Sequence, residues 1–247
     1  MNFSKDGKRE SVEAALAVVA VGWVADTDAL SLAAAGVELN QRKYVKVDEY
    51  LRTTAPHVFA AGDVTGRLML VPEAIQDGFI AATNAVQGPI APLGSRVSPV
   101  GSFTDPEYAQ VGLREAMARQ GHEIVIAKAR FDGTTRPIVD GRTLGLCKLI
   151  VDRKTCKILG CHVIGERAVD IAEVAAIAIA GGMRVDELAR VPLAYPTYAV
   201  VLVRAAVNAA RELNLSLGWQ AHEETTAQTA FRAAERAPSI MPAAVAH

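Results

Sequence analysis

Two adjacent residues in the first third of the chain, Gly62 and Asp63, are of the types that a ligand-binding loop needs. Glycine lets a backbone approach a ligand closely, and a carboxylate accepts hydrogen bonds from ligand hydroxyl groups. A helix is predicted to begin near Pro72, and its free N–H groups would favour negative charge on a bound molecule. Gly-Asp before a helix is also typical of an ordinary turn and cap, so spacing alone leaves both interpretations open.

The elements around this loop follow the pattern of an α/β unit. Val58–Ala61 is predicted as a short buried strand before the loop, Pro72–Val86 as the helix after it, and Tyr44–Val47 as a further short strand. Ala15–Val21 is a nearly continuous apolar run, which is typical of a parallel strand covered on both faces. So few residues precede this run that its neighbouring strands are expected to come from another chain, or the gene product to be truncated.

The second half of the chain has the separated strands and helices of an α+β unit, following a predicted domain boundary at Gly88–Gly94. The strands are predicted at Ile124–Phe131, Leu144–Asp152 and Ile158–Ile164, as an antiparallel meander. The helices are predicted at Leu113–Gln120, Ala168–Ala180, Val185–Ala189 and Tyr198–Leu213. The polar, Ala- and Thr-rich sequence beyond Gly218 predicts a loosely ordered tail.

Composition excludes several classes of function. With 51% hydrophobic and 21% charged residues the chain is globular, and a net charge of −1 with 5% aromatics argues against a nucleic-acid or anionic-membrane partner. The polar N-terminus does not resemble a signal peptide, and the apolar helices are too short and too charged to span a bilayer. Three cysteines favour a reducing compartment, so a cytoplasmic location is expected. The histidine spacings match no zinc pattern, so no metal site is predicted.

Several segments in fixed order resemble one family. Leu51–Gly66 together with Met69–Pro72 resembles the second FAD motif of the pyridine nucleotide-disulfide oxidoreductases, the family of dihydrolipoamide dehydrogenase and mercuric reductase. Val18–Gly22 is similar to the last strand of that family's NAD(P) domain, and Phe103–Gly112 and Ile158–Gly165 are similar to its dimerisation domain. The resemblance covers roughly residues 5–215.

The resemblance implies a fold and a domain order. The fold would be α/β and α+β: the C-terminal part of a two-dinucleotide-binding flavoprotein fold, then an α+β dimerisation domain with an antiparallel sheet. The implied domains are the end of the NAD(P)-binding domain (1–30), the C-terminal part of the FAD-binding domain (31–93), the dimerisation domain (94–215) and a flexible tail (216–247).

The resemblance also implies cofactor contacts. The aspartate in the position of Asp63 binds the ribityl chain of FAD, and the backbone matching Met69, Leu70, Val71 and Pro72 lies beside the flavin ring. Gly62 brings the loop to the flavin, and Gly22 would approach NAD(P)H. The residues after Gly22 depart from the family pattern Val-Gly-Arg-x-Pro-Asn, with Trp23, Val24 and Ala25 in place of Arg-x-Pro.

Departures from the family pattern bear on catalysis. Where the dihydrolipoamide dehydrogenases carry His-Pro-Thr-x-x-Glu, this chain has Tyr195 in the histidine position and Val200 in the glutamate position. A phenol is a poor general base at neutral pH, so lipoamide reduction is the activity that these two replacements make least expected. Tyr195 is predicted either as a catalytic group near the partner subunit's flavin or as a packing residue at the subunit interface.

Cys156 and Cys161 have the Cys-x4-Cys spacing of the family's redox pair. They do not lie at the start of a predicted helix, so the match is interpreted as coincidence. The chain also lacks the C-terminal vicinal cysteines of mercuric reductases.

No Gly-x-Gly-x-x-Gly loop occurs anywhere in the sequence, so the phosphate-binding turns of both dinucleotide sites are missing. The resulting hypothesis is the C-terminal part of an FAD-dependent NAD(P)H oxidoreductase acting on a disulfide, a metal ion or a related acceptor, homodimeric and inactive alone. A complementing N-terminal half would carry the phosphate-binding loops and redox cysteines. The alternative is a non-catalytic dimerisation module derived from that family.

Overall fold

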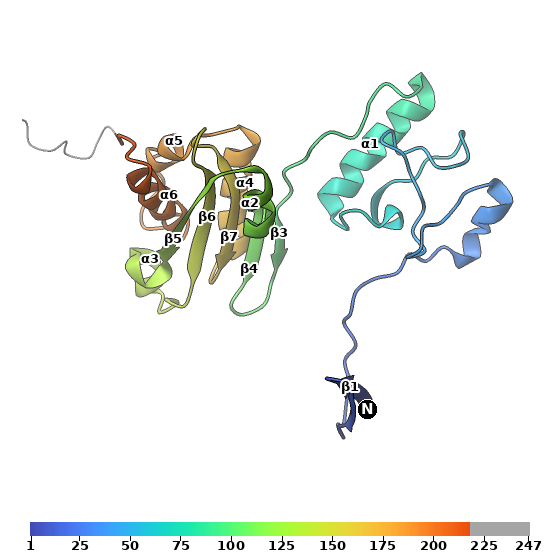
Figure 1. The fold of residues 1–247 in the computed structure, drawn as a ribbon, viewed down its shortest axis with the longest axis horizontal. Helices are drawn as coiled ribbons and strands as arrows, with labels where there is room; N and C mark the ends of the chain where they lie inside the picture. Colours follow the sequence, from blue (N-terminus) through green and yellow to red (C-terminus); the bar gives the residue numbers. More distant parts are fainter. Residues whose placement is uncertain (218–247) are drawn as a thin grey trace, which may run out of the picture. The chain divides into compact units, whose positions relative to one another are not determined.

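The structure, a computed structural model, describes residues 1–217 and forms two compact units (Figure 1). The first unit is Met1–Ser95, and the second begins at Arg96. The predicted loose tail lies almost entirely outside the described residues, which end at Leu217.

The first unit contains one hairpin, three 3-10 helices and one α-helix. These elements are β1 (Asn2–Lys5), β2 (Lys8–Ser11), η1 (Asp28–Leu30), η2 (Leu32–Ala35), η3 (Gly62–Thr65) and α1 (Val71–Gln87). A small apolar cluster of Val37, Val45 and Ala55 is extended by half-buried neighbours and holds the middle of the unit together.

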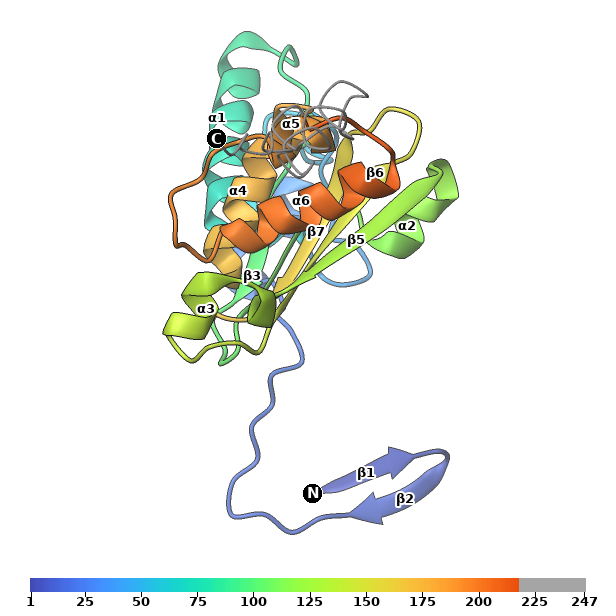
Figure 2. The same cartoon turned by 90° about the vertical axis from the view of Figure 1, so that its left-hand side faces the viewer.

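The hairpin β1–β2 (Figure 2) was not expected from the sequence. Asp6 and Gly7 form its two-residue turn, with φ of 51° and 77°. Asp-Gly is a preferred pair where both turn residues need positive φ, because this backbone twist matches the twist of the two strands. Every residue from 1 to 24 is exposed, so the hairpin is held by its own backbone pairing rather than by packing.

The prediction of a buried strand at Ala15–Val21 is wrong. The segment has no regular secondary structure, and Val18, Val19 and Val21 are 81%, 77% and 91% exposed. A strand forms only when a neighbouring strand accepts its backbone hydrogen bonds, and nothing within the described residues pairs with this one. The residues of this apolar run are of types common in strands, but the segment does not form a strand.

The two short strands predicted near the loop are also wrong in part. Tyr44–Val47 and Val58–Ala61 take part only in isolated bridges, which pair Val45 with Leu39, Val47 with Thr53 and Phe59 with Arg52. Val58–Ala61 is half-buried rather than buried. Single bridges are sufficient here because the apolar cluster, rather than a sheet, organises this unit.

The helix predicted at Pro72–Val86 is observed as α1, Val71–Gln87, with Pro72 in its first turn. Pro72 fits there because the missing N–H would have had no partner within the helix. At the other end, Asn84 is 2% exposed, and its amide donates to the carbonyl oxygens of Tyr50 (2.9 Å) and Ala91 (2.8 Å). Its oxygen accepts from the N–H groups of Ile90 (3.1 Å) and Ala91 (2.9 Å).

Replacement of Asn84 by alanine is expected to destabilise the first unit by about 2 kcal/mol, because it leaves buried backbone groups without partners. Urea unfolding followed by circular dichroism measures the effect. The matched control is Gln87→Ala, which changes an exposed amide side chain at the end of the same helix. Equal midpoints for Asn84→Ala and Gln87→Ala would contradict the role given to Asn84.

The second unit is built on one antiparallel sheet with strand order β3-β4-β7-β6-β5. Its strands are β3 (Val100–Ser102), β4 (Tyr108–Gly112), β5 (Ile124–Arg130), β6 (Leu146–Asp152) and β7 (Ile158–Ile164). Its helices are α2 (Glu115–Gly121), the 3-10 turn η4 (Phe131–Gly133), α3 (Thr135–Val139), α4 (Ala168–Ala180), α5 (Val185–Ala189) and α6 (Val200–Glu212).

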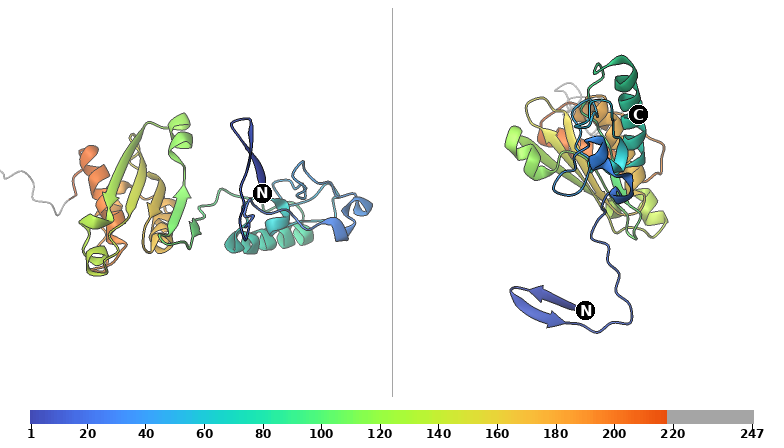
Figure 3. Two further views of the ribbon diagram at one scale, coloured as in Figure 1. Left: turned by 90° about the horizontal axis from the view of Figure 1, so that it is seen from below. Right: turned by 90° about the vertical axis from the view of Figure 1, so that its right-hand side faces the viewer.

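One face of this sheet is covered by helices (Figures 2 and 3). α4 packs on β4 and β7, α6 packs on β5 and β6, and α5 packs against α6. The buried alanines of α4 and α6 let the helices lie close to the strands, where Leu149, Ile171 and Leu202 complete the core. Three predicted elements, Ile158–Ile164, Ala168–Ala180 and Val185–Ala189, have the predicted bounds. No helix of residues 1–217 is both long and apolar enough to cross a membrane.

Candidate functional site

The loop with Gly62 and Asp63 forms the 3-10 turn η3, directly before the segment that leads into α1. Gly62 has φ of 73°, and a Cβ placed on it would lie 3.0 Å from the Cβ of Ala74 in α1. Both facts favour glycine, because side chains rarely adopt this backbone conformation and the helix leaves little space. The Thr65 hydroxyl donates to the Gly62 carbonyl oxygen at 2.7 Å and closes the turn.

Asp63 lies at the surface of this loop with a free carboxylate. It is exposed and makes no side-chain hydrogen bond or ion pair within the part of the chain that the structure describes. Leu70, the residue before α1, adds no side-chain cap, so the helix start is not occupied by a side chain of its own N-cap. The Asp63 carboxylate is therefore available to a ligand.

Asp63 and Met69 line the same hollow, of about 180 Å³, and Trp23–Asp26 and Tyr44 complete its wall. The Tyr44 hydroxyl donates to the Trp23 carbonyl oxygen at 2.6 Å, which ties the exposed N-terminal segment to the ring that lies beside Gly66. Tyr44 itself is 2% exposed. The hollow thus brings two predicted cofactor residues, Asp63 and Met69, beside the segment Trp23–Asp26, which is distant from them in sequence.

The other predicted cofactor residues lie around this hollow without lining it. Leu70 is half-buried, and Val71, 74% exposed, presents its side chain to solvent. Gly22 has φ of 120°, and nothing lies within 4 Å of a Cβ placed on it. The side of the backbone where a Cβ of residue 22 would lie is therefore open.

Tyr195 belongs to the second unit, where it is 69% exposed. Its hydroxyl hydrogen-bonds the hydroxyl of Thr135, at the start of α3, and it precedes Pro196 in a cis peptide. Val200, in the position of the family's glutamate, is the first residue of α6 and has no polar group. The phenol of Tyr195 is consequently oriented by a threonine rather than by a carboxylate.

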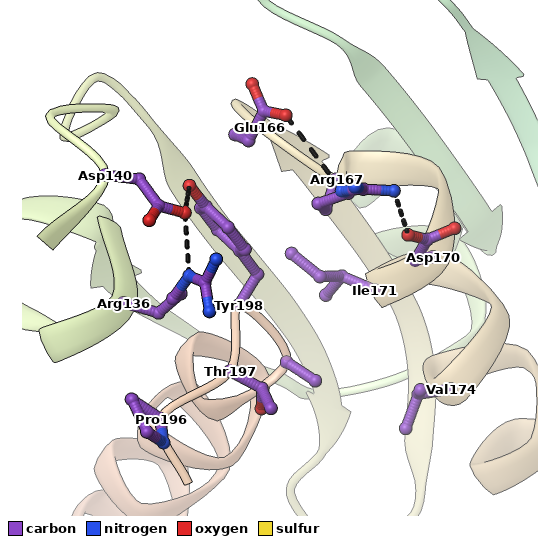
Figure 4. Close-up of a pocket in the computed structure, with 11 residues that line it drawn as sticks. Arg136, Asp140, Glu166, Arg167, Asp170, Ile171, Val174, Pro196, Thr197 and Tyr198 are labelled. Carbon is purple, nitrogen blue, oxygen red and sulfur yellow. Dashed lines mark hydrogen bonds and ion pairs between the residues drawn. The ribbon is translucent and has the colours of Figure 1, made fainter. Parts of the chain in front are cut away.

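A neighbouring tyrosine, which the sequence did not single out, is part of a stronger polar network (Figure 4). Tyr198 donates to Asp140 at 2.8 Å, and Arg136 donates to the same carboxylate at 2.7 Å. Burial and the bond to Asp140 raise the pKa of Tyr198 to about 12, while the bonds from Arg136 and Tyr198 lower the pKa of Asp140. Tyr198 therefore stays a neutral donor, and these residues help to line a hollow of about 390 Å³ beside α4.

His122, an exposed residue in the loop between α2 and β5, has a carboxylate partner. Its Nδ1 lies 2.6 Å from Oδ2 of Asp152, which is 7% exposed at the end of β6. The backbone N–H of Thr155, at 2.6 Å, and then the His122 ring lower the pKa of Asp152 to about 2 from 3.8. This pair lies at a strand end and stabilises the turn that joins β6 to β7.

The lowered pKa predicts acid sensitivity. Because the folded-state pKa of Asp152 lies below the unfolded value, its stabilisation is fully present above about pH 4 and is lost as the pH falls through about 2. Asp152→Asn is expected to be about 2 kcal/mol less stable at neutral pH. The difference should shrink as the pH falls, in denaturant unfolding at several pH values. A difference independent of pH would contradict this assignment.

Cys156 and Cys161 do not pair. Cys161 lies on β7 with its Sγ 3.8 Å from that of Cys147 on β6, while Cys156 precedes β7 in a turn with φ of 59°. All three are free and buried. The bond with Cys161, together with burial, raises the pKa of the Cys147 thiol well above its usual value, which keeps it protonated. Within residues 1–217, no three His, Cys, Asp or Glu side chains converge as metal ligands.

Comparison with known proteins decides the family. The profile of "Pyridine nucleotide-disulphide oxidoreductase" matches residues 2–78, and that of "Pyridine nucleotide-disulphide oxidoreductase, dimerisation domain" matches residues 98–206. The chain belongs to the pyridine nucleotide-disulphide oxidoreductase family. The sheet order and the antiparallel pairing described above are accordingly those of a dimerisation domain of this family.

Individual relatives agree with this family. The chain is 36% identical over 195 residues to a mercuric reductase of Bacillus cereus, covering 78% of this chain and 31% of that protein. It is 33% identical over 207 residues to the dihydrolipoyl dehydrogenase of Bacillus subtilis, covering 83% and 44%. Among solved structures, the HOCl-induced flavoprotein disulfide reductase RclA from Escherichia coli is similar with a TM-score of 0.73 and 25% identity, over 83% of this chain and 47% of RclA.

The chain spans less than half the length of these relatives. Flavin and pyridine nucleotide are the cofactor classes of the family, as its name and the description of RclA as a flavoprotein state. In this chain, the hollow lined by Asp63 and Met69 is the candidate place for contacts with a flavin.

Proposed function

We propose that this chain contributes part of an FAD site and a dimerisation domain to an NAD(P)H oxidoreductase that acts on a disulfide, a metal ion or a related acceptor. The observation that carries this proposal is the pairing of a free Asp63 carboxylate with an uncapped helix start beside one hollow. In this proposal residues 1–30 end the NAD(P)-binding domain, 31–93 belong to the FAD-binding domain and 94–215 form the dimerisation domain.

The residues present fit a flavin. Asp63 has unused acceptor capacity for ribityl hydroxyls, and Gly62 lets the backbone turn without a side chain in the way. The first turn of α1, with Met69 and Leu70 before it, would face the ring and stabilise negative charge there. A bound flavin would supply the hydride-accepting ring; the chain's own part is to bind and orient it.

Tyr195 is proposed as the group that meets the partner subunit's flavin. Its exposure leaves it accessible, and its bond with Thr135 gives the phenol a defined direction. A phenol donates a hydrogen bond but is a weak base at neutral pH, and Val200 offers no carboxylate to assist it. These features favour an acceptor other than lipoamide.

A homodimer is proposed from the dimerisation domain and from apolar side chains that this unit leaves exposed, including Ile138 (57%), Val139 (70%) and Ile177 (74%). Light scattering of the purified protein is expected to give twice the chain mass of 26.2 kDa. A monomer at high concentration would contradict the proposed assembly without bearing on the flavin contacts.

Asp63 provides the direct test of the flavin contact. Asp63→Asn is expected to weaken FAD binding about tenfold, since it removes a charged hydrogen-bond acceptor. Quenching of flavin fluorescence on titration with protein measures the affinity. The matched control is Glu49→Gln, an exposed carboxylate of the same unit outside the hollow.

The second candidate is a non-catalytic dimerisation module of the same family, for which the dimerisation-domain match over residues 98–206 is the supporting observation. Protein that dimerises but takes up no added FAD would support this candidate and contradict the flavin proposal. Equal affinities for the Asp63→Asn and Glu49→Gln variants would remove Asp63 from the site.

A further inference from the structure

A groove in the second unit has a concentration of positive charge that the flavin proposal does not use. It is a hollow of about 700 Å³ between β5, η4 and α6. Its charged residues are Lys128, Arg130, Asp132, Arg204 and Arg211. We refer to this surface as the basic groove; it contains none of the residues assigned above to the flavin site or to catalysis.

The charges in the basic groove are unbalanced. Arg130 forms an ion pair with Asp132, with Nη2 and Oδ2 2.5 Å apart, so these two side chains neutralise each other. The side chains of Lys128, Arg204 and Arg211 make no ion pair or hydrogen bond with any of residues 1–217. Four cations and one carboxylate give the groove a net charge of +3, in a chain whose net charge is −1. Unpaired like charges gathered in one hollow favour the binding of an anion.

The spacing of the arginines limits the shape of that anion. Arg204 and Arg211 are seven residues apart on α6, so they lie on the same face about 10 Å from each other along the helix. Val203 and Val207, both half-buried, form an apolar wall of the same groove. The groove therefore suits an elongated molecule with negative charge and an apolar part.

The size of the groove and the state of the β5 edge favour a small molecule over a peptide strand. About 700 Å³ is within the range of small-molecule sites. β5 is an edge strand, but the Asn208 amide already donates to the Lys128 carbonyl oxygen at 2.9 Å. A peptide adding to this edge would have to displace that bond.

We propose that the basic groove binds a phosphate-bearing small molecule with at least two negative charges, such as a nucleoside diphosphate. The planar guanidinium groups of Arg204 and Arg211 would donate to phosphate oxygens, with Lys128 as a third cation. The apolar portion of the ligand would lie on Val203 and Val207. The site is independent of the proposed flavin function.

Calorimetric titration of the whole protein with ADP and with pyrophosphate tests this proposal, and uncharged adenosine is the ligand control. Both anions are expected to bind and adenosine is not. The double variant Arg204→Gln/Arg211→Gln should bind ADP at least about tenfold more weakly. The control Arg114→Gln/Lys154→Gln removes two exposed cations outside the groove and should change the affinity less than about twofold.

Three results would overturn the proposal. One is the absence of ADP and pyrophosphate binding. Another is an equal loss of affinity in the two double variants, which would indicate a general charge effect. The third is binding of a polyglutamate peptide by protein that ignores both anions, which would make the groove a surface for an acidic protein. Circular dichroism of each variant checks that folding is unchanged.

Discussion

Replacement of Gly66 by alanine is expected to destabilise the first unit by about 3 kcal/mol. Gly66 has φ of 66°, and a Cβ placed on it would lie 2.3 Å from the ring of Tyr44. Because Tyr44 is buried, its ring cannot move without disturbing the hollow at Asp63 and the bond to Trp23. The variant should therefore lose both stability and flavin affinity.

Urea unfolding and FAD titration measure these two losses. Gly78→Ala is the matched control: nothing lies within 4 Å of a Cβ placed on Gly78, and it lies inside α1. There alanine should be neutral or stabilising by up to about 1 kcal/mol, because it favours helix. If Gly66→Ala unfolded at the same urea concentration as the unmodified protein, the packing described for this loop would be refuted.

The second large effect is expected for Phe131, whose replacement by alanine should destabilise the second unit by about 4 kcal/mol. The side chain is fully buried, and Gly145 and Gly165 lie so close that a Cβ on either would come within 2.5 Å and 2.7 Å of the ring. On another side the ring contacts Tyr198, with centroids 6.1 Å apart. A cavity at Phe131 would thus also loosen the segment that carries Tyr195.

Phe103→Ala provides the comparison, since Phe103 belongs to the same unit but is 84% exposed. Its loss should change stability by less than about 0.5 kcal/mol. Similar unfolding midpoints for the two alanine variants would contradict the central position given to Phe131. Thermal unfolding followed by circular dichroism distinguishes the outcomes.

The second unit was predictable from sequence because its apolar periodicity and its packing agree. Ala168–Ala180 is rich in alanine and is followed by two glycines. Ile158–Ile164 is rich in apolar residues and lies in the sheet between β4 and β6, where most of its residues are buried. Local preference and tertiary contacts favour the same structure at these positions. The strand ends at β5 and β6 and the start of α6 differ from prediction by one or two residues, as expected where helices and strands fray.

The first unit shows what sequence pattern cannot supply. The apolar composition of Ala15–Val21 predicts a strand, but pairing is a tertiary property and the segment has no partner in the described residues. The hairpin around Asp6 and Gly7 has one local signal in the sequence, the Asp-Gly pair between two short polar runs. Turn chemistry was more informative here than hydrophobicity.

The site was partly predictable for a similar reason. Asp63 and Met69 could be predicted because they belong to one continuous motif, and they line one hollow. The network of Tyr198, Asp140 and Arg136 joins α3 and its C-terminal end to the segment before α6, so no local spacing in the sequence indicates it. The basic groove likewise depends on the position of α6 beside β5.

The central claim is that the loop at Asp63 and the start of α1 bind a flavin. Amide chemical shifts of the protein during titration with FAD test it most directly. Saturable shift changes are expected at the residues around Asp63 and Met69–Val71, with half-saturation at an FAD concentration about tenfold higher in Asp63→Asn and unchanged in Glu49→Gln. Absence of shift changes at these residues, or an unchanged half-saturation concentration in the Asp63→Asn variant, would contradict this claim.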